Sequence, residues 1–297
     1  MYKSVLAMKK EFKVSLLNTL LKYLFNRNAL TNAVLKGTTV PLKIGQMRQL
    51  INLLNNGWQI GTVNDTHVKM VNKDGSVITC RLKYGFDLGH LNEIWIDQAY
   101  GSDFKDANVV DVGASNGDSS IFFAKRGAKK VIGFEPDNRS YNLALENVRD
   151  SGVEQIVTVQ NKAISSYTGQ TKLFVSKENP NENSIDNKNM VILPGDAIHE
   201  EDIECISLRE AISIFGGEDV DLLKMDCEGC EYKVMNSLDA NDYSRIERIY
   251  LEYHNGVQNL PETLEKNGFS CHIIGDTNST GYIVGRRDSN HQVTLEC

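Results

Sequence analysis

The sequence predicts an α/β fold with a mostly parallel sheet, helices on both faces of that sheet, and an antiparallel hairpin near the end of the chain. From Asn108 onward, short apolar runs alternate with helical stretches, a pattern typical of right-handed βαβ crossovers. The apolar runs 269–274 and 282–284 lie too close together for a crossover helix, so they should pair as an antiparallel hairpin. We therefore expect two domains, an N-terminal accessory segment over residues 1–95 and an α/β domain over residues 96–297.

The accessory segment is expected to combine helices with a hairpin. Apolar residues at helical spacing predict one helix over residues 14–25 and a second over residues 44–55. Alternating runs at 67–71 and 77–82 are joined by a turn that contains Asp-Gly, which predicts a β-hairpin. Because these residues include no catalytic cluster, we interpret the segment as an α+β cap or packing element.

The composition is that of an ordinary globular protein. The 32 Lys and Arg residues against 39 Asp and Glu residues give a formal net charge of −7, which argues against a nucleic-acid partner. Six cysteines are too few for a disulfide scaffold, so a reducing compartment, the cytoplasm, is expected. The helix over residues 14–25 is too short to cross a bilayer, so packing on the protein body is favoured and weak peripheral membrane contact is the alternative. None of these features specifies an oligomeric state.

The elements of the α/β domain follow one another in a regular order. Strands are expected at 109–112, 131–134, 156–160, 171–175, 220–225 and 246–252, and helices at 119–126 and 141–149. The polar stretch 177–201 is expected to be a long loop that shapes a substrate pocket. A mostly parallel sheet that ends in an antiparallel hairpin is typical of the Rossmann-like class I methyltransferase fold and not of dinucleotide dehydrogenases.

A glycine turn after the first strand of this domain is the strongest local signal for a ligand. Gly113 and Gly117 allow positive φ angles and close approach of a ligand to the backbone, and a helix with unpaired N–H groups follows. Ser115 stands where a dinucleotide fingerprint needs its middle glycine, so a pyrophosphate is disfavoured. S-adenosylmethionine, which has no phosphate, suits this turn, and we predict that Asp111, Gly113, Asn116 and Gly117 contribute to its site.

Glu135 supports the same interpretation. It ends the second strand of the domain and follows Gly113 by 22 residues. A carboxylate at this position of a Rossmann-like sheet can accept hydrogen bonds from both hydroxyl groups of a ribose. We therefore predict that Glu135 holds the ribose of the cofactor.

A second set of polar residues follows two later strands. Asp226 comes directly after the apolar strand at 220–225, and Glu228 and Glu231 follow within five residues. Ligands of open α/β sheets bind at the carboxyl ends of the strands, so Asp226 and Glu228 are candidate catalytic residues. His254 follows the strand at 246–252 and should face the same cleft.

These motifs resemble those of the FkbM family of S-adenosylmethionine-dependent methyltransferases. Three segments carry the resemblance: VVDVGASNGDSSIFFAKRGAKKVIGFEP, LLKMDCEGCEYKVM and IYLEYH. The resemblance covers about residues 95–255. The resemblance implies methylation of a hydroxyl oxygen on a sugar, a glycan or a small metabolite. In that reaction Asp226 or His254 would remove the hydroxyl proton. A divalent cation held by Asp226, Glu228 and Glu252 is the alternative route, although no metal is the preferred expectation.

Cys227 and Cys230 depart from the small apolar residues usual in the family. A structural zinc site needs four ligands and the sequence has no second C-x-x-C, so we interpret the pair as small buried thiols. Two other functional classes stay open. A nicotinamide-dependent oxidoreductase would use Glu135 in the same way but lacks the middle glycine, and a non-catalytic binding protein would keep the fold but would be expected to lose a site carboxylate.

Overall fold

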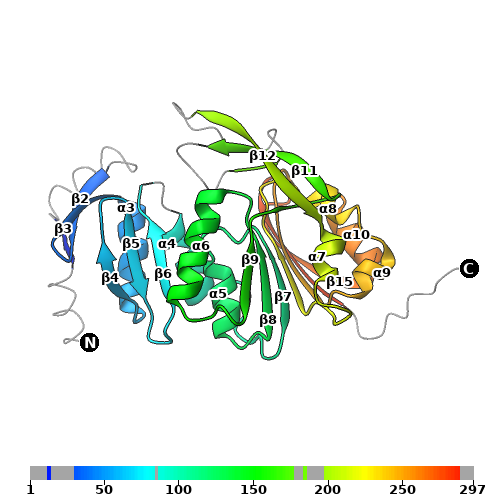
Figure 1. Ribbon diagram of the computed structural model, residues 1–297, viewed down its shortest axis with the longest axis horizontal. Coiled ribbons are helices and arrows are strands. Elements are labelled where there is room, and N and C mark those ends of the chain that lie inside the picture. The colour runs from blue at the N-terminus through cyan, green and yellow to red at the C-terminus, as the bar shows by residue number, and fades with distance from the viewer. Residues whose placement is uncertain (1–11, 15–29, 84–85, 177–182, 186–196, 288–297) are drawn as a thin grey trace, which may run out of the picture. The chain divides into compact units, whose positions relative to one another are not determined.

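The computed structural model describes residues 12–14, 30–83, 86–176, 183–185 and 197–287 (Figure 1). These residues fall into two compact units. The first contains the described residues up to Ser102 together with Leu145–Val153, and the second contains Asp103–Ala144 and the described residues from Glu154 onward. The second unit carries every residue that the sequence nominates for a site.

Small antiparallel sheets and short helices make up the first unit. One sheet is formed by β1 (Phe12–Val14), β2 (Leu30–Leu35) and β3 (Thr38–Lys43), another by β4 (Gln59–Val63), β5 (His67–Val71) and β6 (Val77–Arg81), and the helices are α3 (Ile44–Asn55), α4 (Asp87–Leu91) and the π-helix η1 (Asn92–Ile96). The predicted helix over residues 44–55 and the predicted hairpin are confirmed as α3 and β5–β6. The predictions omitted β4 and the hairpin β2–β3.

The β2–β3 hairpin turns through Lys36 and Gly37, which both have positive φ, at 45° and 88°. Two-residue hairpin turns of this kind normally contain Asn-Gly or Asp-Gly, so Lys-Gly offers a weaker signal. Of the predicted helix over residues 14–25, Val14 belongs to β1 instead, and the other residues lie outside the described part of the chain. Among the described residues, no helix is long and apolar enough to cross a membrane.

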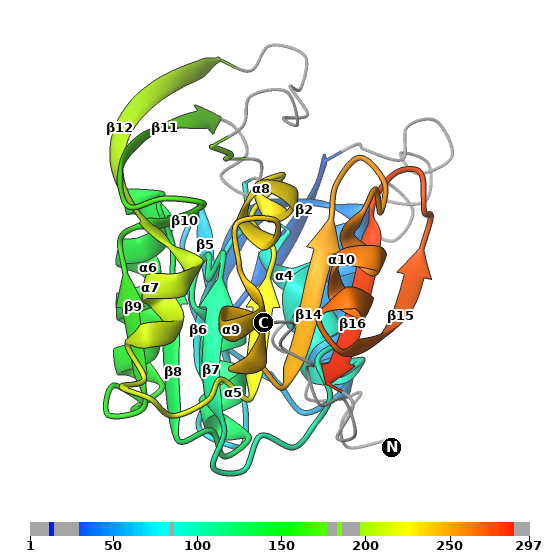
Figure 2. The same ribbon diagram turned by 90° about the vertical axis from the view of Figure 1, so that its right-hand side faces the viewer.

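A seven-stranded mixed sheet forms the centre of the second unit (Figure 2). Its strand order is β15-β16-β14-β13-β7-β8-β9. The strands are β7 (Asn108–Val112), β8 (Lys130–Phe134), β9 (Val157–Gln160), β13 (Leu222–Met225), β14 (Arg248–Tyr253), β15 (Phe269–Gly275) and β16 (Gly281–Arg287). The helices of this unit are α5 (Asp118–Lys125), α7 (Leu208–Ser213), α8 (Glu231–Met235), α9 (Ala240–Ser244) and α10 (Leu260–Lys266). The helix α6 (Asn138–Asp150) belongs to this unit up to Ala144 and to the first unit from Leu145 onward. The parallel pairing of β9-β8-β7-β13-β14 and the antiparallel hairpin β15–β16 are both confirmed.

Register in the sheet brings the carboxyl ends of its central strands together. Met225 of β13 pairs with Val112 of β7 on one side and with Leu251 of β14 on the other. Every residue of β7 and of β13 is buried, because both strands lie inside the sheet and are covered on both faces. The residues that follow β7, β13 and β14 therefore emerge side by side at one edge.

A smaller sheet corrects the prediction of a loop over residues 177–201. It is formed by β10 (Ala163–Ser165), β11 (Gly169–Ser176) and β12 (Ile198–Ser207), so the last four residues of the predicted loop belong to a strand. Residues 198–204 pair antiparallel with β11 and are mostly exposed. Because these paired residues face solvent, they do not show the alternation of apolar and polar residues from which strands were predicted.

Candidate active site

The glycine turn lies between the ends of β8 and β13. The N–H groups of Gly113 and Ala114 both donate to the carbonyl oxygen of Phe134, at 3.0 Å. Gly113 has φ +75°, and a Cβ atom at this position would lie 1.8 Å from the carbonyl oxygen of Asp226. Only glycine fits here, because the main chain of the turn touches the main chain of the residue that follows β13.

Asp111 lies beneath this turn and is fully buried. The hydroxyl groups of Ser119 and Ser120 donate to its Oδ2, at 2.7 and 2.6 Å, and the Lys224 ammonium lies 3.2 Å from its Oδ1. In this position Asp111 fastens α5 and β13 to the end of β7. Asp111 was predicted to contribute to the cofactor site. Through its contacts with the protein, it holds the glycine turn in place from below.

Lys224 was not predicted from the sequence to belong to the site. Its Nζ also donates to the carbonyl oxygens of Val112 and Gly113, at 3.1 and 2.8 Å. Burial alone would lower the pKa of this ammonium, but Asp111 and then Asp226 outweigh burial and raise it. The buried lysine therefore stays charged and supports the turn. A lysine inside the apolar strand Leu-Leu-Lys-Met was the available signal, because buried cations require partners.

Gly117 and Asn116 occupy the far side of the turn. Gly117 has φ +82°, precedes α5 directly, and would bring a Cβ atom within 3.2 Å of Ala144 in α6. It therefore allows α6 to pack closely against the turn. The Asn116 side chain is 1% exposed, so its predicted contact with a ligand would have to be made inside the turn.

Glu135 stands at the end of β8, beside the turn. Its Oε2 accepts from the N–H of Ser115 at 2.8 Å, and its Oε1 accepts from the N–H of Asp137 at 2.7 Å. Each oxygen has a second lone pair, so the carboxylate can hold the turn and still accept from a ribose hydroxyl. A carboxylate that can accept from a ribose hydroxyl therefore lies directly beside the turn.

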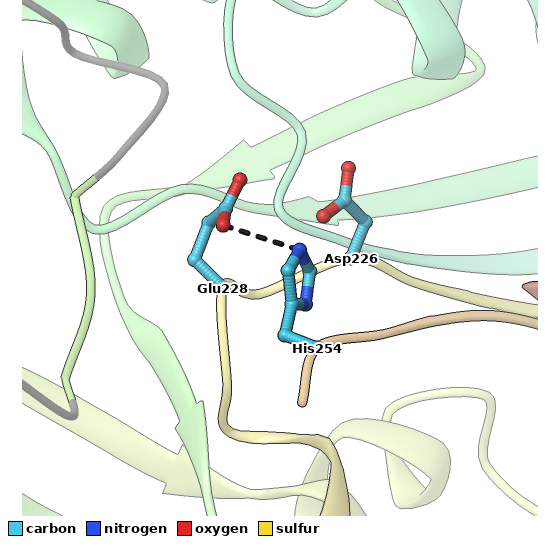
Figure 3. Close-up of side chains that lie close together, drawn as sticks. All are labelled: Asp226, Glu228 and His254. Carbon is cyan, nitrogen blue, oxygen red and sulfur yellow. Dashed lines mark ion pairs between the residues drawn. The ribbon is translucent and has the colours of Figure 1, made fainter. Parts of the chain in front are cut away.

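Asp226, Glu228 and His254 come together at the ends of β13 and β14 (Figure 3). One oxygen of each carboxylate and one nitrogen of the imidazole all lie within 4.8 Å of one another. The His254 Nε2 is 3.2 Å from Glu228 Oε2 and 4.0 Å from Glu252 Oε1. The three residues predicted to be catalytic therefore form one partly buried cluster.

Glu231 fixes the orientation of His254 and was not recognised from the sequence. Its side chain is fully buried, and its Oε1 lies 3.2 Å from His254 Nδ1. The same oxygen accepts from the N–H groups of Cys227 and Gly229, at 3.3 and 3.1 Å. A glutamate at the start of a helix is common because it interacts favourably with the helix dipole, so Glu231 gave no sign of another role. Only the structure shows that its side chain turns back toward β14.

The surroundings of the His254 ring favour positive charge. Burial alone would lower the pKa of the ring, but the contacts with Glu231 and Glu228 and the nearby Asp226 outweigh burial and raise it to about 10. Tyr232 of α8 anchors the segment that carries the ring, because its hydroxyl donates to the carbonyl oxygens of His254 and Gly256. The ring is thus held between carboxylates on both of its nitrogen atoms.

Cys227 and Cys230 form a disulfide, which corrects the interpretation of the pair as free thiols. Their Cα atoms lie 5.6 Å apart because the chain turns sharply into α8. The bond closes a short loop in which Glu228 and Gly229 both have positive φ, at 55° and 108°. The disulfide therefore helps to hold Glu228, a non-glycine residue, in a conformation that it would otherwise avoid.

We expect the disulfide to contribute modestly to stability. Replacing Cys227 by Val together with Cys230 by Ala should lower the free energy of unfolding by at most about 2 kcal/mol, because the loop that the bond closes is very short. Denaturant unfolding with and without dithiothreitol checks this. The reductant should bring the wild-type protein to the stability of the double variant and leave the double variant unchanged. Equal stability of all four samples would show that the bond contributes nothing.

A cavity of about 170 Å³ borders the loop between Cys227 and Cys230, because Gly229 and Cys230 belong to its lining. The residues that line it include Ser165, Tyr167, Thr171, Gly229 and Lys233. None of the residues predicted for the site belongs to its lining. The Ser184 hydroxyl donates to the carbonyl oxygen of Glu228 at 2.6 Å, so the described part of the 177–201 segment does contact the loop.

The fold and the site together define a class I methyltransferase domain. The strand order, with its antiparallel hairpin, is that of this class. Residues 111–271, just over half of the chain, match the family model described as the methyltransferase FkbM domain. The chain belongs to this family, and S-adenosyl-L-methionine is the cofactor of the domain.

Curated relatives match shorter segments. Two ribosomal protein L11 methyltransferases are similar, one from Alkaliphilus oremlandii with 45% identity over 56 residues and one from Caldanaerobacter subterraneus with 33% identity over 70 residues. The matches cover 19% and 24% of this chain and only 18% and 23% of those relatives. A solved structure of methyltransferase FkbM from Methylobacillus flagellatus is 16% identical, with a TM-score of 0.42, and the match covers 61% of this chain and 44% of that chain.

Proposed function

We propose that the chain transfers a methyl group from S-adenosylmethionine to a hydroxyl oxygen of a sugar, a glycan or a small metabolite. The observation that carries this proposal is the position of Asp226. Its main chain touches Gly113 of the cofactor turn, and its side chain belongs to the cluster with Glu228 and His254. One residue therefore joins the cofactor position to a set of groups that can accept a proton.

The cofactor supplies an electrophilic methyl group on its sulfonium. Gly113 and Glu135 hold the cofactor, so that an acceptor hydroxyl bound near Asp226 can approach the methyl group in line. We assign removal of the hydroxyl proton to the Asp226 carboxylate. His254 is less suited to this step, because carboxylates already occupy both of its ring nitrogens, those of Glu231 on one side and Glu228 on the other.

Two observations weigh against the alternative functions. In the described structure the turn residue Ser115 has φ +46° and its N–H donates to Glu135, a compact arrangement without the middle glycine that a pyrophosphate requires. A non-catalytic binding protein would have no need for a clustered Asp226, Glu228 and His254. Calorimetry separates the classes, since our proposal expects binding of S-adenosylmethionine and no binding of a nicotinamide cofactor.

The reaction itself is tested with S-adenosylmethionine carrying a labelled methyl group. The purified protein is incubated with this cofactor and a cell extract, and labelled products are identified by mass spectrometry. We expect a methyl ether, which resists mild base. A labelled methyl ester, a methylated nitrogen or a methylated carbon would contradict the assignment of the acceptor oxygen.

Glu135 should govern cofactor affinity. Glu135→Ala removes a charged acceptor from the ribose position, so S-adenosylmethionine binding should weaken by about 1.5 to 3 kcal/mol, measured by calorimetry. Glu135→Gln keeps one acceptor oxygen for the turn and should fall between the wild-type protein and the alanine variant. Unchanged affinity in a folded alanine variant would show that the ribose lies elsewhere.

A further inference from the structure

The cluster at the ends of β13 and β14 has the composition of a cation site. It presents two carboxylates, from Asp226 and Glu228, and one imidazole, from His254, with their ligand atoms within 4.8 Å of one another. Carboxylate oxygens with one imidazole nitrogen suit divalent metal ions that accept mixed oxygen and nitrogen ligands, such as Mn²⁺. Three protein ligands of this kind leave coordination positions for water or a substrate oxygen.

The groups around the cluster support the same interpretation. The fully buried Glu231 contacts His254 Nδ1, which leaves Nε2 facing the two carboxylates. A second carboxylate behind the histidine is the usual arrangement in metal sites, because it fixes the ring and its tautomer. The Oε2 of Glu231 is buried without a hydrogen-bond partner among the described residues.

Carboxylates surround the imidazole of the cluster on several sides. Glu252 brings another carboxylate to within 4.0 Å of the ring. Lys224, the buried cation of β13, is engaged by Asp111 and by the carbonyl oxygens of the glycine turn. A partly buried group of carboxylates is stabilised when a cation joins it, and a divalent ion is often the largest charge in such a site.

We infer that Asp226, Glu228 and His254 hold one divalent cation, with Mn²⁺ preferred over Mg²⁺, and that the acceptor hydroxyl binds to it. This inference rests on the proposed function, and it adds a metal ion to the step in which the acceptor hydroxyl loses its proton. The set differs from the one considered from the sequence, since His254 replaces Glu252. Glu231 is a positioning residue that acts on the cation through the histidine.

In the methyl-transfer step, Asp226 binds the cation through only one of its carboxylate oxygens. The cation lowers the pKa of the bound hydroxyl, and the second oxygen of Asp226 takes the proton. The acceptor oxygen forms a bond to the methyl carbon while the carbon–sulfur bond breaks, and the sulfur keeps that electron pair. The products are a methyl ether and S-adenosylhomocysteine.

Binding of Mn²⁺ alone tests the site without any assay of activity. The full-length protein, freed of metal by chelation and kept without reductant, is titrated with MnCl₂ and followed by electron paramagnetic resonance. We expect one equivalent to bind, and Asp226→Asn, Glu228→Gln and His254→Ala each to weaken binding at least tenfold. Glu231→Gln, which keeps the shape of the side chain, should weaken it about 10- to 100-fold through the histidine.

Two variants control the assignment. Glu247→Gln removes a carboxylate from the opposite end of β14, where it faces Arg287, and should leave Mn²⁺ affinity within threefold of wild type. Glu252→Gln should also stay within threefold, and a loss as large as that of Glu228→Gln would overturn the ligand set. Absence of Mn²⁺ binding in a protein that still binds S-adenosylmethionine would overturn the metal site and leave the proposed function intact. Mn²⁺ binding in a protein that makes no methyl ether would contradict the proposed function instead.

Discussion

Asp226→Asn is expected to lower kcat by at least 100-fold while S-adenosylmethionine affinity stays within about threefold of wild type. The substitution keeps the size of the side chain and removes the charge to which we assign uptake of the hydroxyl proton. The main-chain contact between Asp226 and Gly113 does not depend on the side chain, so the cofactor turn should keep its shape. Steady-state kinetics with the acceptor, together with calorimetry of cofactor binding, separates the two effects.

Asp219→Asn is the matched control for this experiment. Asp219 is exposed and precedes β13, at the end of the strand away from the cluster, where its carboxylate lies 4.0 Å from Arg245. The same chemical change there should leave kcat and cofactor affinity unaltered. Full turnover by Asp226→Asn would remove both the proton-acceptor role and the metal-ligand role of this residue.

Gly113→Ala is expected to abolish measurable cofactor binding. A Cβ atom would lie 1.8 Å from the Asp226 carbonyl oxygen, and main-chain atoms on both sides cannot both stay in place. The turn must therefore separate from the end of β13, which displaces the backbone to which we assign the cofactor. Calorimetry measures the loss of binding, and thermal unfolding shows whether the variant remains folded.

Gly216→Ala is the control that distinguishes the collision at position 113 from the effect of backbone strain alone. Gly216 has φ +68°, close to the +75° of Gly113, but a Cβ atom there would meet nothing within 4 Å. Alanine in this backbone conformation costs roughly 1 to 2 kcal/mol, so the control variant should lose stability and keep cofactor affinity. Equal cofactor affinity in both folded variants would contradict the position that we assign to the turn.

The positions of the residues that we propose for the cofactor site could be predicted from the sequence, because each of them lies at the end of a strand or in the turn that follows it. Gly113 and Glu135 each lie at the end of a strand whose apolar residues are continuous in the chain, and parallel strands align such ends at one edge. The same reasoning located Asp226, and it brought His254 to the same edge although 27 residues separate the two. Strand periodicity and glycine placement were sufficient for this part.

The supporting contacts could not be predicted, because they depend on how side chains from distant elements pack. Lys224 and Asp111 are 113 residues apart, and only the pairing of β7 with β13 brings the ammonium to the carboxylate. Glu231 was noted only as an acidic residue close to Asp226, and the turn into α8 directs its side chain back to His254. The sequence pattern likewise predicted free thiols at Cys227 and Cys230, whereas the distance between their Cα atoms allowed a bond.

The sequence by itself therefore determined the class of sheet, the edge at which we propose the site and the residue types available there. Those features follow from hydrophobic periodicity and from glycine at positive φ, which act over a few residues. The tertiary structure decided which groups face one another, so that His254, and not Glu252, completes the cluster with Asp226 and Glu228. The physical reason is that charges interact over a few ångströms through space, and neighbours at that distance are set by strand register and by the path of the loop between Cys227 and Cys230.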